Sequence, residues 1–203
     1  PDAVTSTRAI VLLPATTLDD AIAPIEVLIQ EGLTVVSLPA AGELTPQQLS
    51  ATFGPRLTVG VHDLGEQAQA RWAVEQHVPF ALTDGRPEVA DVLAEAGVAA
   101  IASALTPTEV AAVWRSGVAG VQVVPATAFG NSYPPQLVAL VPQAALIARG
   151  AESSYEIKAW LNAGAAAVAV GEKLLGDALN GGDLAALRLR ARPVAEAAAA
   201  TTA

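Results

Sequence analysis

The sequence of 203 residues contains no cysteine and only two histidines. Without thiols the chain cannot form disulfide bonds, use a cysteine nucleophile or bind zinc through cysteine. Two histidines are too few for a histidine-rich metal site, so we expect neither a bound metal nor another cofactor. One alternative stays open, because Asp63, Asp84 and Glu172 could bring oxygen ligands to a hard cation such as Mg²⁺.

Basic residues are also scarce. The chain has 11 Lys and Arg against 20 Asp and Glu, a net charge of −9, which leaves no basic stripe for nucleic acid or an anionic membrane. No apolar run is long enough to span a bilayer, and no N-terminal stretch has the pattern of a signal peptide. We therefore expect a cytoplasmic protein with no nucleic-acid and no membrane partner.

One rhythm repeats along the chain: a helix-like stretch ends at glycine, and a short run rich in Val, Ile and Ala follows. Gly32, Gly97, Gly117 and Gly164 show it most clearly. Glycine accepts the left-handed conformation that ends a helix, and uninterrupted apolar runs suit strands buried on both faces. The rhythm predicts eight strands that start about 19 to 25 residues apart, one βα unit each: Arg8–Leu13, Leu33–Leu38, Leu57–Val61, Pro79–Leu82, Val98–Ala102, Ala119–Val124, Ala144–Ala148 and Ala166–Val170.

Capping boxes mark several helix starts. Thr45 and Thr106 are each followed by Pro and, three residues on, by Gln or Glu; Ser153 has Glu three residues on. Such pairs satisfy amide donors that the first helical turn leaves free. Asp183 follows a glycine turn and is expected to cap the last helix. No linker divides the chain, so we predict one α/β domain over 1–203, with a closed barrel or an open doubly wound sheet still possible.

Two stretches resemble the KDPG/KHG (2-keto-3-deoxy-6-phosphogluconate/4-hydroxy-2-oxoglutarate) aldolase family: Leu105-Thr-Pro-Thr-Glu-Val110 and Val121-Gln-Val-Val-Pro-Ala126. The resemblance covers nearly the whole chain and is strongest over 106–175. It implies a single (β/α)8 TIM barrel of the class I aldolase type, assembled as a homotrimer. It also implies a lyase that cleaves 2-keto-4-hydroxy acids to pyruvate and an aldehyde, using a Schiff-base lysine on strand 6 and a glutamate on strand 2.

The sequence differs from the family pattern at both catalytic positions. Gln122 stands at the lysine position, and an amide nitrogen cannot form an imine. Ser37 stands at the glutamate position. The family's Schiff-base route is therefore predicted to be absent, unless another lysine replaces the lost one. Lys158 is expected on a solvated helix face, whereas Lys173 follows strand 8 and could bind an anion, replace the nucleophile or be a surface residue beside Glu172.

Barrel enzymes of this type carry their chemistry at the C-terminal ends of the strands. His62 with Asp63 is a local pair suited to proton transfer, although a loop histidine and a helix cap would look the same. Arg149 could hold a carboxylate or a phosphate as a fork, or pair with Glu152. We name as catalytic candidates Gln122, Ser37, His62, Asp63 and Lys173, and as binding candidates Thr83, Asp84, Ser103, Arg149 and Glu172, with Thr127 also at this end.

Two functions remain open from the sequence. One is a lyase, an aldehyde-lyase by family, that acts on a small 2-oxo acid or binds another small anion. The other is a non-catalytic barrel, a ligand-binding or assembly protein that kept the fold. Trp72, Trp114 and Trp160 are all expected on helices, packed against the barrel or at a subunit contact.

Overall fold

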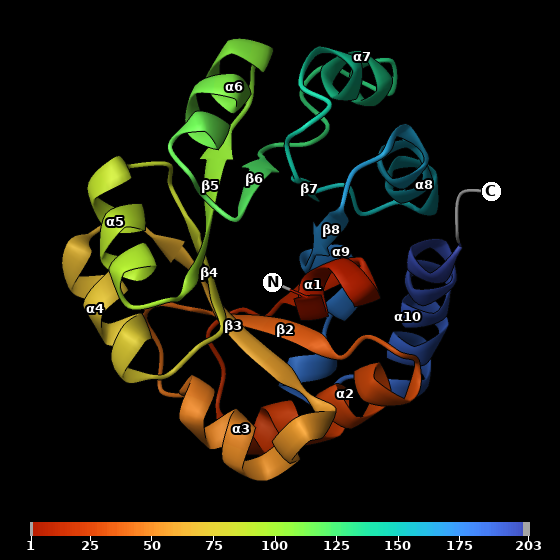
Figure 1. Ribbon diagram of the computed structural model, residues 1–203. Coiled ribbons are helices and arrows are strands. Elements are labelled where there is room, and N and C mark those ends of the chain that lie inside the picture. The colour runs from red at the N-terminus through yellow and green to blue at the C-terminus, as the bar shows by residue number, and fades with distance from the viewer. Residues whose placement is uncertain (1, 201–203) are drawn as a thin grey trace.

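The computed structural model describes residues 2–200 and shows eight parallel strands that alternate with helices. Each strand pairs with the next along the chain, and β8 pairs with β1, which closes the barrel (Figure 1). The predicted (β/α)8 barrel is confirmed and the open sheet is excluded. The strands are β1 (Ala9–Leu12), β2 (Val35–Pro39), β3 (Thr58–Leu64), β4 (Phe80–Thr83), β5 (Ala99–Ala104), β6 (Gly120–Val123), β7 (Leu146–Arg149) and β8 (Ala167–Val170).

The helices form the outer layer of the barrel, and the four caps predicted from the sequence are present. Thr45, Thr106 and Ser153 each make a reciprocal capping box, and Asp183 caps the last helix. The elements are α1 (Asp2–Thr7), α2 (Leu18–Gln30), α3 (Pro46–Phe53), η1 (Gly54–Arg56), α4 (Gln67–Glu75), α5 (Pro87–Glu95), α6 (Pro107–Arg115), α7 (Tyr133–Leu140), α8 (Ser154–Ala163), α9 (Glu172–Leu175), η2 (Ala178–Asn180) and α10 (Leu184–Ala199).

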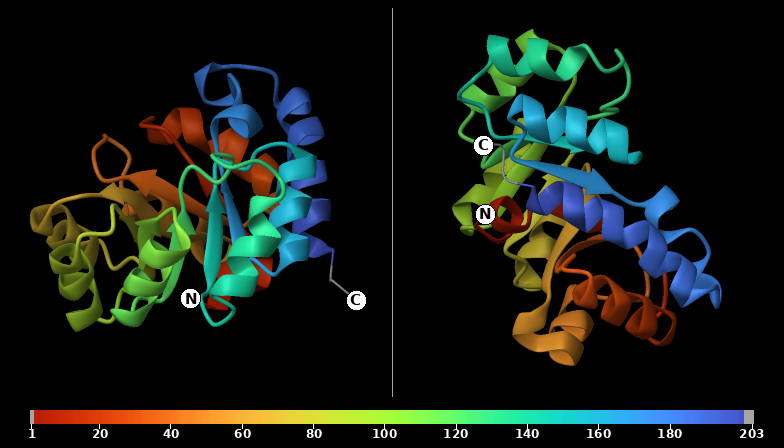
Figure 2. Two further views of the ribbon diagram at one scale, coloured as in Figure 1. Left: turned by 90° about the horizontal axis from the view of Figure 1, so that it is seen from above. Right: turned by 90° about the vertical axis from the view of Figure 1, so that its right-hand side faces the viewer.

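The three tryptophans lie on helices, as predicted. Trp160 on α8 is buried, and its indole N–H donates to the carbonyl of Ala126. Trp72 and Trp114 are partly buried and pack against the core between helices and barrel. Helix α10 lies beside α8 and α2 and completes the helical layer, as the right-hand view of Figure 2 shows. No helix within residues 2–200 is both long enough and apolar enough to cross a membrane.

The barrel interior is packed at its N-terminal end by apolar side chains. Phe80 occupies the space that Gly60 leaves, since a Cβ on Gly60 would lie 2.4 Å from the Phe80 ring. Helix α1, which the sequence analysis left undefined, covers this end and inserts Val4 into the same cluster. Large and small side chains from neighbouring strands thus fill this end of the barrel as a packed core.

Candidate functional site

A polar layer lies above the apolar one at the C-terminal ends of the strands. The buried polar residues within residues 2–200 all lie at this end: Ser37, His62, Thr83 and Gln122. Side chains alternate between the two faces of a strand, so the residue two positions after an interior apolar residue again points inward. Val35 is followed in this way by Ser37, and Ile147 by Arg149. The alternation of side chains along the strands therefore places these polar groups at the mouth of the barrel.

His62 is the buried titratable group of this layer, with 5 % of its surface exposed. Its Nδ1 lies 3.1 Å from Ser37 Oγ, and the side chain lines a cavity at the mouth. Burial lowers the pKa of His62 to about 4; Asp63 works against this and Arg149 adds to it. The imidazole is therefore neutral at pH 7.

Asp63 and Arg149 form an ion pair beside the imidazole. Arg149 Nη1 lies 2.7 Å from Asp63 Oδ1, whereas His62 Nε2 is 3.8 Å from Asp63 Oδ2. Burial acts to raise the pKa of Asp63, but the hydrogen bond and charge of Arg149, with a smaller contribution from His62, outweigh it and the pKa is lowered. The predicted partner of His62 is thus engaged mainly by Arg149, and Arg149 pairs with Asp63 rather than with Glu152.

The backbone of β3 explains how Asp63 reaches Arg149. Asp63 has φ +61°, in the left-handed region, and the register between β3 and β4 shifts between Val61 and Leu64. Asp tolerates this conformation better than most residues. The strand thus continues to Leu64, and His62 and Asp63 belong to it, whereas the sequence predicted that the strand ends at Val61.

Gln122 is the centre of a hydrogen-bond network below the mouth. Its Nε2 donates to the carbonyl of Thr83 at 2.9 Å and to Ser103 Oγ at 3.0 Å. Ser103 Oγ donates to the same carbonyl at 2.7 Å, and Arg149 Nη1 lies 3.4 Å from Gln122 Oε1. The amide is therefore held by partners on three strands, and Thr83 contributes its backbone rather than its hydroxyl.

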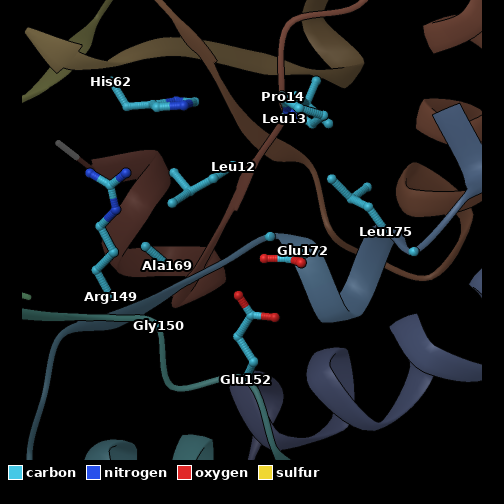
Figure 3. A pocket seen from close by; sticks show the side chains of 12 residues that line it. Leu12, Leu13, Pro14, His62, Arg149, Gly150, Glu152, Ala169, Glu172 and Leu175 are labelled. Carbon is cyan, nitrogen blue, oxygen red and sulfur yellow. The ribbon is translucent and has the colours of Figure 1, made fainter. Parts of the chain in front are cut away.

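Arg149 lines two of the cavities that open at this end. The first, of about 440 Å³, is lined by His62 and Arg149 and by Leu12, Glu152, Glu172 and Leu175 among others. The second, of about 410 Å³, is lined by Asp63, Asp84, Thr83, Ser103, Gln122 and Arg149 among others. Figure 3 shows the first cavity, with His62 and Arg149 on one side of Leu12 and the two glutamates on the other.

The predicted site residues therefore fall into two groups. Arg149 joins Ser37, His62 and Asp63 to the Gln122 network. Asp84 lies on the rim, in an ion pair with Arg86 at 2.8 Å. Glu172 is exposed at the far end of the first cavity, and Thr127 is exposed after β6.

The two lysines lie apart from Gln122. Lys158 is exposed on α8, and Lys173 is exposed on α9; neither is among the residues that line the two cavities. The hydrogen bonds of Ser153, chiefly from its backbone, lower the pKa of Glu156, and the charge of Lys173 adds to this. The ammonium of Lys173 thus acts on the start of α8.

The sequence analysis missed the role of Glu152. Its Oε2 accepts the backbone N–H of Lys173 at 2.6 Å, so this carboxylate satisfies a free amide of α9. A glutamate four residues before the Glu156 of a capping box gives no local signal for such a contact, because its partner is 21 residues away. Within residues 2–200 no three His, Asp or Glu side chains are grouped to hold a metal ion.

No family model matches the sequence, and no curated protein sequence is similar to it. Solved structures are similar over nearly the full length. The KDPG aldolase of Legionella pneumophila, with pyruvate captured as a covalent carbinolamine, has a TM-score of 0.83 at 18 % identity and covers 95 % of this chain and 96 % of its own. A 4-hydroxy-2-oxoglutarate/2-dehydro-3-deoxyphosphogluconate aldolase gives 0.82 at 23 % identity, with 98 % of each chain covered.

The chain has the fold of these aldolases. A third member, the Zymomonas mobilis KDPG aldolase with 3-phosphoglycerate, gives a TM-score of 0.80 at 16 % identity over 96 % of this chain and 94 % of its own. The resemblance drawn from the sequence is thereby confirmed for the fold. Function has to be argued from the site, because one barrel supports many chemistries.

Proposed function

We propose that the protein is a lyase for small 2-keto-4-hydroxy acids that works by acid–base chemistry from His62 and not through an imine. The observation that carries this proposal is a neutral, buried imidazole beside a guanidinium at the mouth of the barrel. Structures of the same fold hold pyruvate or 3-phosphoglycerate, which supports a small oxygen-rich ligand.

Arg149 is suited to hold the carboxylate of such a substrate. Its side chain is 20 % exposed, and its contacts within the described chain all use Nη1. A guanidinium has five N–H donors in a planar fork, so Nη2 and Nε remain for a ligand. Asp63 has a half-exposed side chain, which allows it to turn toward solvent when a substrate carboxylate arrives.

In the proposed cleavage His62 both removes a proton and returns it. In the forward direction His62 accepts the proton of the C4 hydroxyl while the C3–C4 bond breaks, which releases the aldehyde. The electron pair of that bond becomes the enolate of pyruvate, whose oxygen the guanidinium of Arg149 stabilises. His62 then returns its proton to C3, giving pyruvate and the neutral imidazole. Ser37 Oγ, 3.1 Å from Nδ1, positions the ring.

The proposal is tested with 4-hydroxy-2-oxoglutarate as substrate and a lactate dehydrogenase assay for pyruvate. We expect turnover by the wild type and a loss of about 10²–10⁴-fold in His62→Gln, the usual contribution of a general base. The control is His77→Asn, since His77 is exposed at the opposite end of the barrel. Asn is chosen there because His77 has a positive φ, which Asn tolerates. Equal activity in both variants would contradict the role of His62.

Borohydride trapping with pyruvate distinguishes the proposed acid–base route from the imine route of the aldolase family. We expect intact-mass spectra with no reduced pyruvate adduct, because the exposed Lys158 and Lys173 lie outside both cavities. An adduct on either lysine would contradict the proposed mechanism and indicate that this lysine forms the Schiff base.

A non-catalytic ligand-binding barrel is the second candidate, and the closed network around Gln122 favours it. The amide is fully engaged, and Arg149 is already paired with Asp63. This function predicts that pyruvate binds, as seen by ligand-observed NMR, while no 2-keto-4-hydroxy acid is cleaved with or without divalent metal.

We also propose that the chain forms a homotrimer. The large apolar side chains of Phe129, Leu140 and Tyr155 are exposed near α7 and at the start of α8, and we assign the subunit contact to this side of the barrel. A cage designed by fusing symmetric oligomeric domains contains the same fold, with a TM-score of 0.81 at 20 % identity over 94 % of this chain and 71 % of its own. Light scattering after size exclusion should give three times the monomer mass; a monomer would contradict the proposal.

A further inference from the structure

We propose that Gln122 is a positioning residue, which holds the guanidinium of Arg149 in place while a substrate carboxylate replaces Asp63 there. This inference rests on the function proposed above and adds a residue to its machinery. Gln122 is 1 % exposed and lies on β6, beside the strand β7 that carries Arg149. It is not among the residues that line the first cavity, so it acts on a ligand in that cavity through Arg149.

The orientation of the Gln122 amide is fixed by a group that only accepts hydrogen bonds. Its Nε2 lies 2.9 Å from the carbonyl oxygen of Thr83 and 3.0 Å from Ser103 Oγ. A carbonyl oxygen has no proton to donate, so the NH2 group has to face it and Oε1 has to face away. The reversed amide would set two oxygens against each other at Thr83 and an NH2 group against the guanidinium. Oε1 therefore points to Arg149 because Thr83 leaves it no alternative.

Arg149 Nη1 has two partners of different charge. Asp63 Oδ1 lies 2.7 Å away and Gln122 Oε1 lies 3.4 Å away. Asp63 reaches Arg149 from β3, which is opposite β7 in the closed order of eight strands, and its side chain is half-exposed. A substrate carboxylate competes with Asp63 for the guanidinium because both are anions. The neutral amide of Gln122 keeps its contact during this exchange.

Once Asp63 has left, Gln122 is the remaining partner of the guanidinium among residues 2–200. A neutral acceptor holds Nη1 without cancelling its charge, so Nη2 and Nε stay available to the ligand. A carboxylate at position 122 would hold the group but neutralise it, and an apolar side chain would not hold it. An amide whose oxygen faces Arg149 meets both requirements.

The first experiment needs no ligand and follows the Nη–H signals of Arg149 by NMR at low temperature, assigned by their loss in Arg149→Lys. Asp63→Gly removes the charged partner, and glycine accepts the positive φ of this position. We expect the signals to persist in Asp63→Gly and to broaden beyond detection when Gln122→Met is added. They should return in Asp63→Gly with Gln122→Glu, because the carboxylate is again an acceptor. Signals that persist in the Met variant, or are lost equally in the Glu variant, would overturn the inference.

Methionine is chosen because its side chain has nearly the length of glutamine and lacks a strong acceptor. The carbonyl of Thr83 keeps a donor in this variant, since Ser103 Oγ also donates to it at 2.7 Å. The substitution therefore leaves no buried backbone group without a partner, and we expect the fold to be retained.

The second experiment measures the affinity for pyruvate by ligand-observed NMR. Gln122→Met should raise the Kd about fivefold, the scale of one hydrogen bond. Gln122→Glu should raise it further, since its charge competes with the ligand at Arg149. The matched control is Gln76→Met, because Gln76 is a partly buried glutamine at the end of α4 whose Oε1 has no partner within residues 2–200. It should bind pyruvate as the wild type does; wild-type affinity in Gln122→Met would contradict the inference.

The outcomes separate this inference from the proposed function. Cleavage of 4-hydroxy-2-oxoglutarate, with Arg149 signals and pyruvate affinity that do not depend on Gln122, would leave the lyase standing and remove the positioning role. Signals and affinity that depend on Gln122, in a protein that cleaves no 2-keto-4-hydroxy acid, would retain the role and remove the lyase.

Discussion

The two ends of the barrel interior are built from opposite chemistry, although the same strands supply both. At the N-terminal end the interior is apolar and helix α1 covers it. Two residues further along, the same strand faces place hydrogen-bonding side chains. The pairs of lower and upper residues are Val35 and Ser37, Gly60 and His62, Ile101 and Ser103, Gly120 and Gln122, and Ile147 and Arg149.

The difference shows which end stabilises the fold and which end serves a ligand. Apolar packing at the N-terminal end contributes stability directly. Polar groups at the other end gain little from burial even when they are hydrogen-bonded. Ser37, His62 and Gln122 occupy positions where apolar residues would pack. Chemistry at the mouth of the barrel therefore explains these residues better than stability does.

The largest expected effect comes from breaking the apolar end. Phe80→Ala removes the ring that fills the space above Gly60 and should lower the free energy of unfolding by about 3–5 kcal/mol. Urea denaturation measures this loss. Phe129→Ala, at an exposed position, is the matched control and should change stability by less than about 0.5 kcal/mol. Similar losses in both variants would contradict the division between the two ends.

A smaller effect on stability comes from the protonation of His62 at the polar end. The pKa of His62 is lowered from 6.5 to about 4 in the folded protein, so below pH 6.5 the unfolded chain binds the proton more tightly. Stability is fully present above pH 6.5 and is lost as the pH falls toward 4, by up to about 3 kcal/mol. His62→Gln should lack this component. Parallel pH curves for the wild type and the variant would show that burial does not perturb His62.

Gln122→Lys tests the polar end of the barrel by adding the amine that the site lacks. The lysine would lie near the Thr83 carbonyl and Ser103 Oγ, and the positive charge of Arg149 would keep part of it neutral and nucleophilic. Borohydride reduction with pyruvate should add about 72 Da, the mass of a reduced imine. We expect a cost of about 1–3 kcal/mol in stability from the buried amine.

The matched control for this substitution is Gln76→Lys, on the helical side of the barrel away from the mouth. It should show no pyruvate adduct. A folded Gln122→Lys variant without an adduct would contradict the placement of Gln122 at the reacting end.

The barrel could be predicted because its determinants are local. Apolar runs, glycines with positive φ at Gly32, Gly97, Gly117 and Gly164, and capping boxes all lie within a few residues of the elements they define. Two features had no such signal. Helix α1 is held by Val4 packing into the barrel, and the extension of β3 depends on a bulge at Asp63.

The site was predictable as a set of residues and not as a set of contacts. Strand ends identified His62, Asp63, Gln122 and Arg149, because parallel strands place their C-terminal ends together. The partner of Arg149 depends on the positive φ of Asp63, 86 positions earlier in the chain, and no local pattern encodes that bond. The contact of Glu152 with the α9 backbone is long-range for the same reason.

The central claim, that buried His62 is the acid–base group, is tested most directly by the pH profile of pyruvate C3 deuterium exchange. The imidazole has to be neutral to accept a proton, so kcat/KM for exchange should stay level from pH 7 downward and fall only near pH 4. Proton NMR of the methyl signal in D2O gives the rate, with His62→Gln as the baseline. A fall centred near pH 6.5, or exchange equal to that of His62→Gln at every pH, would contradict the account.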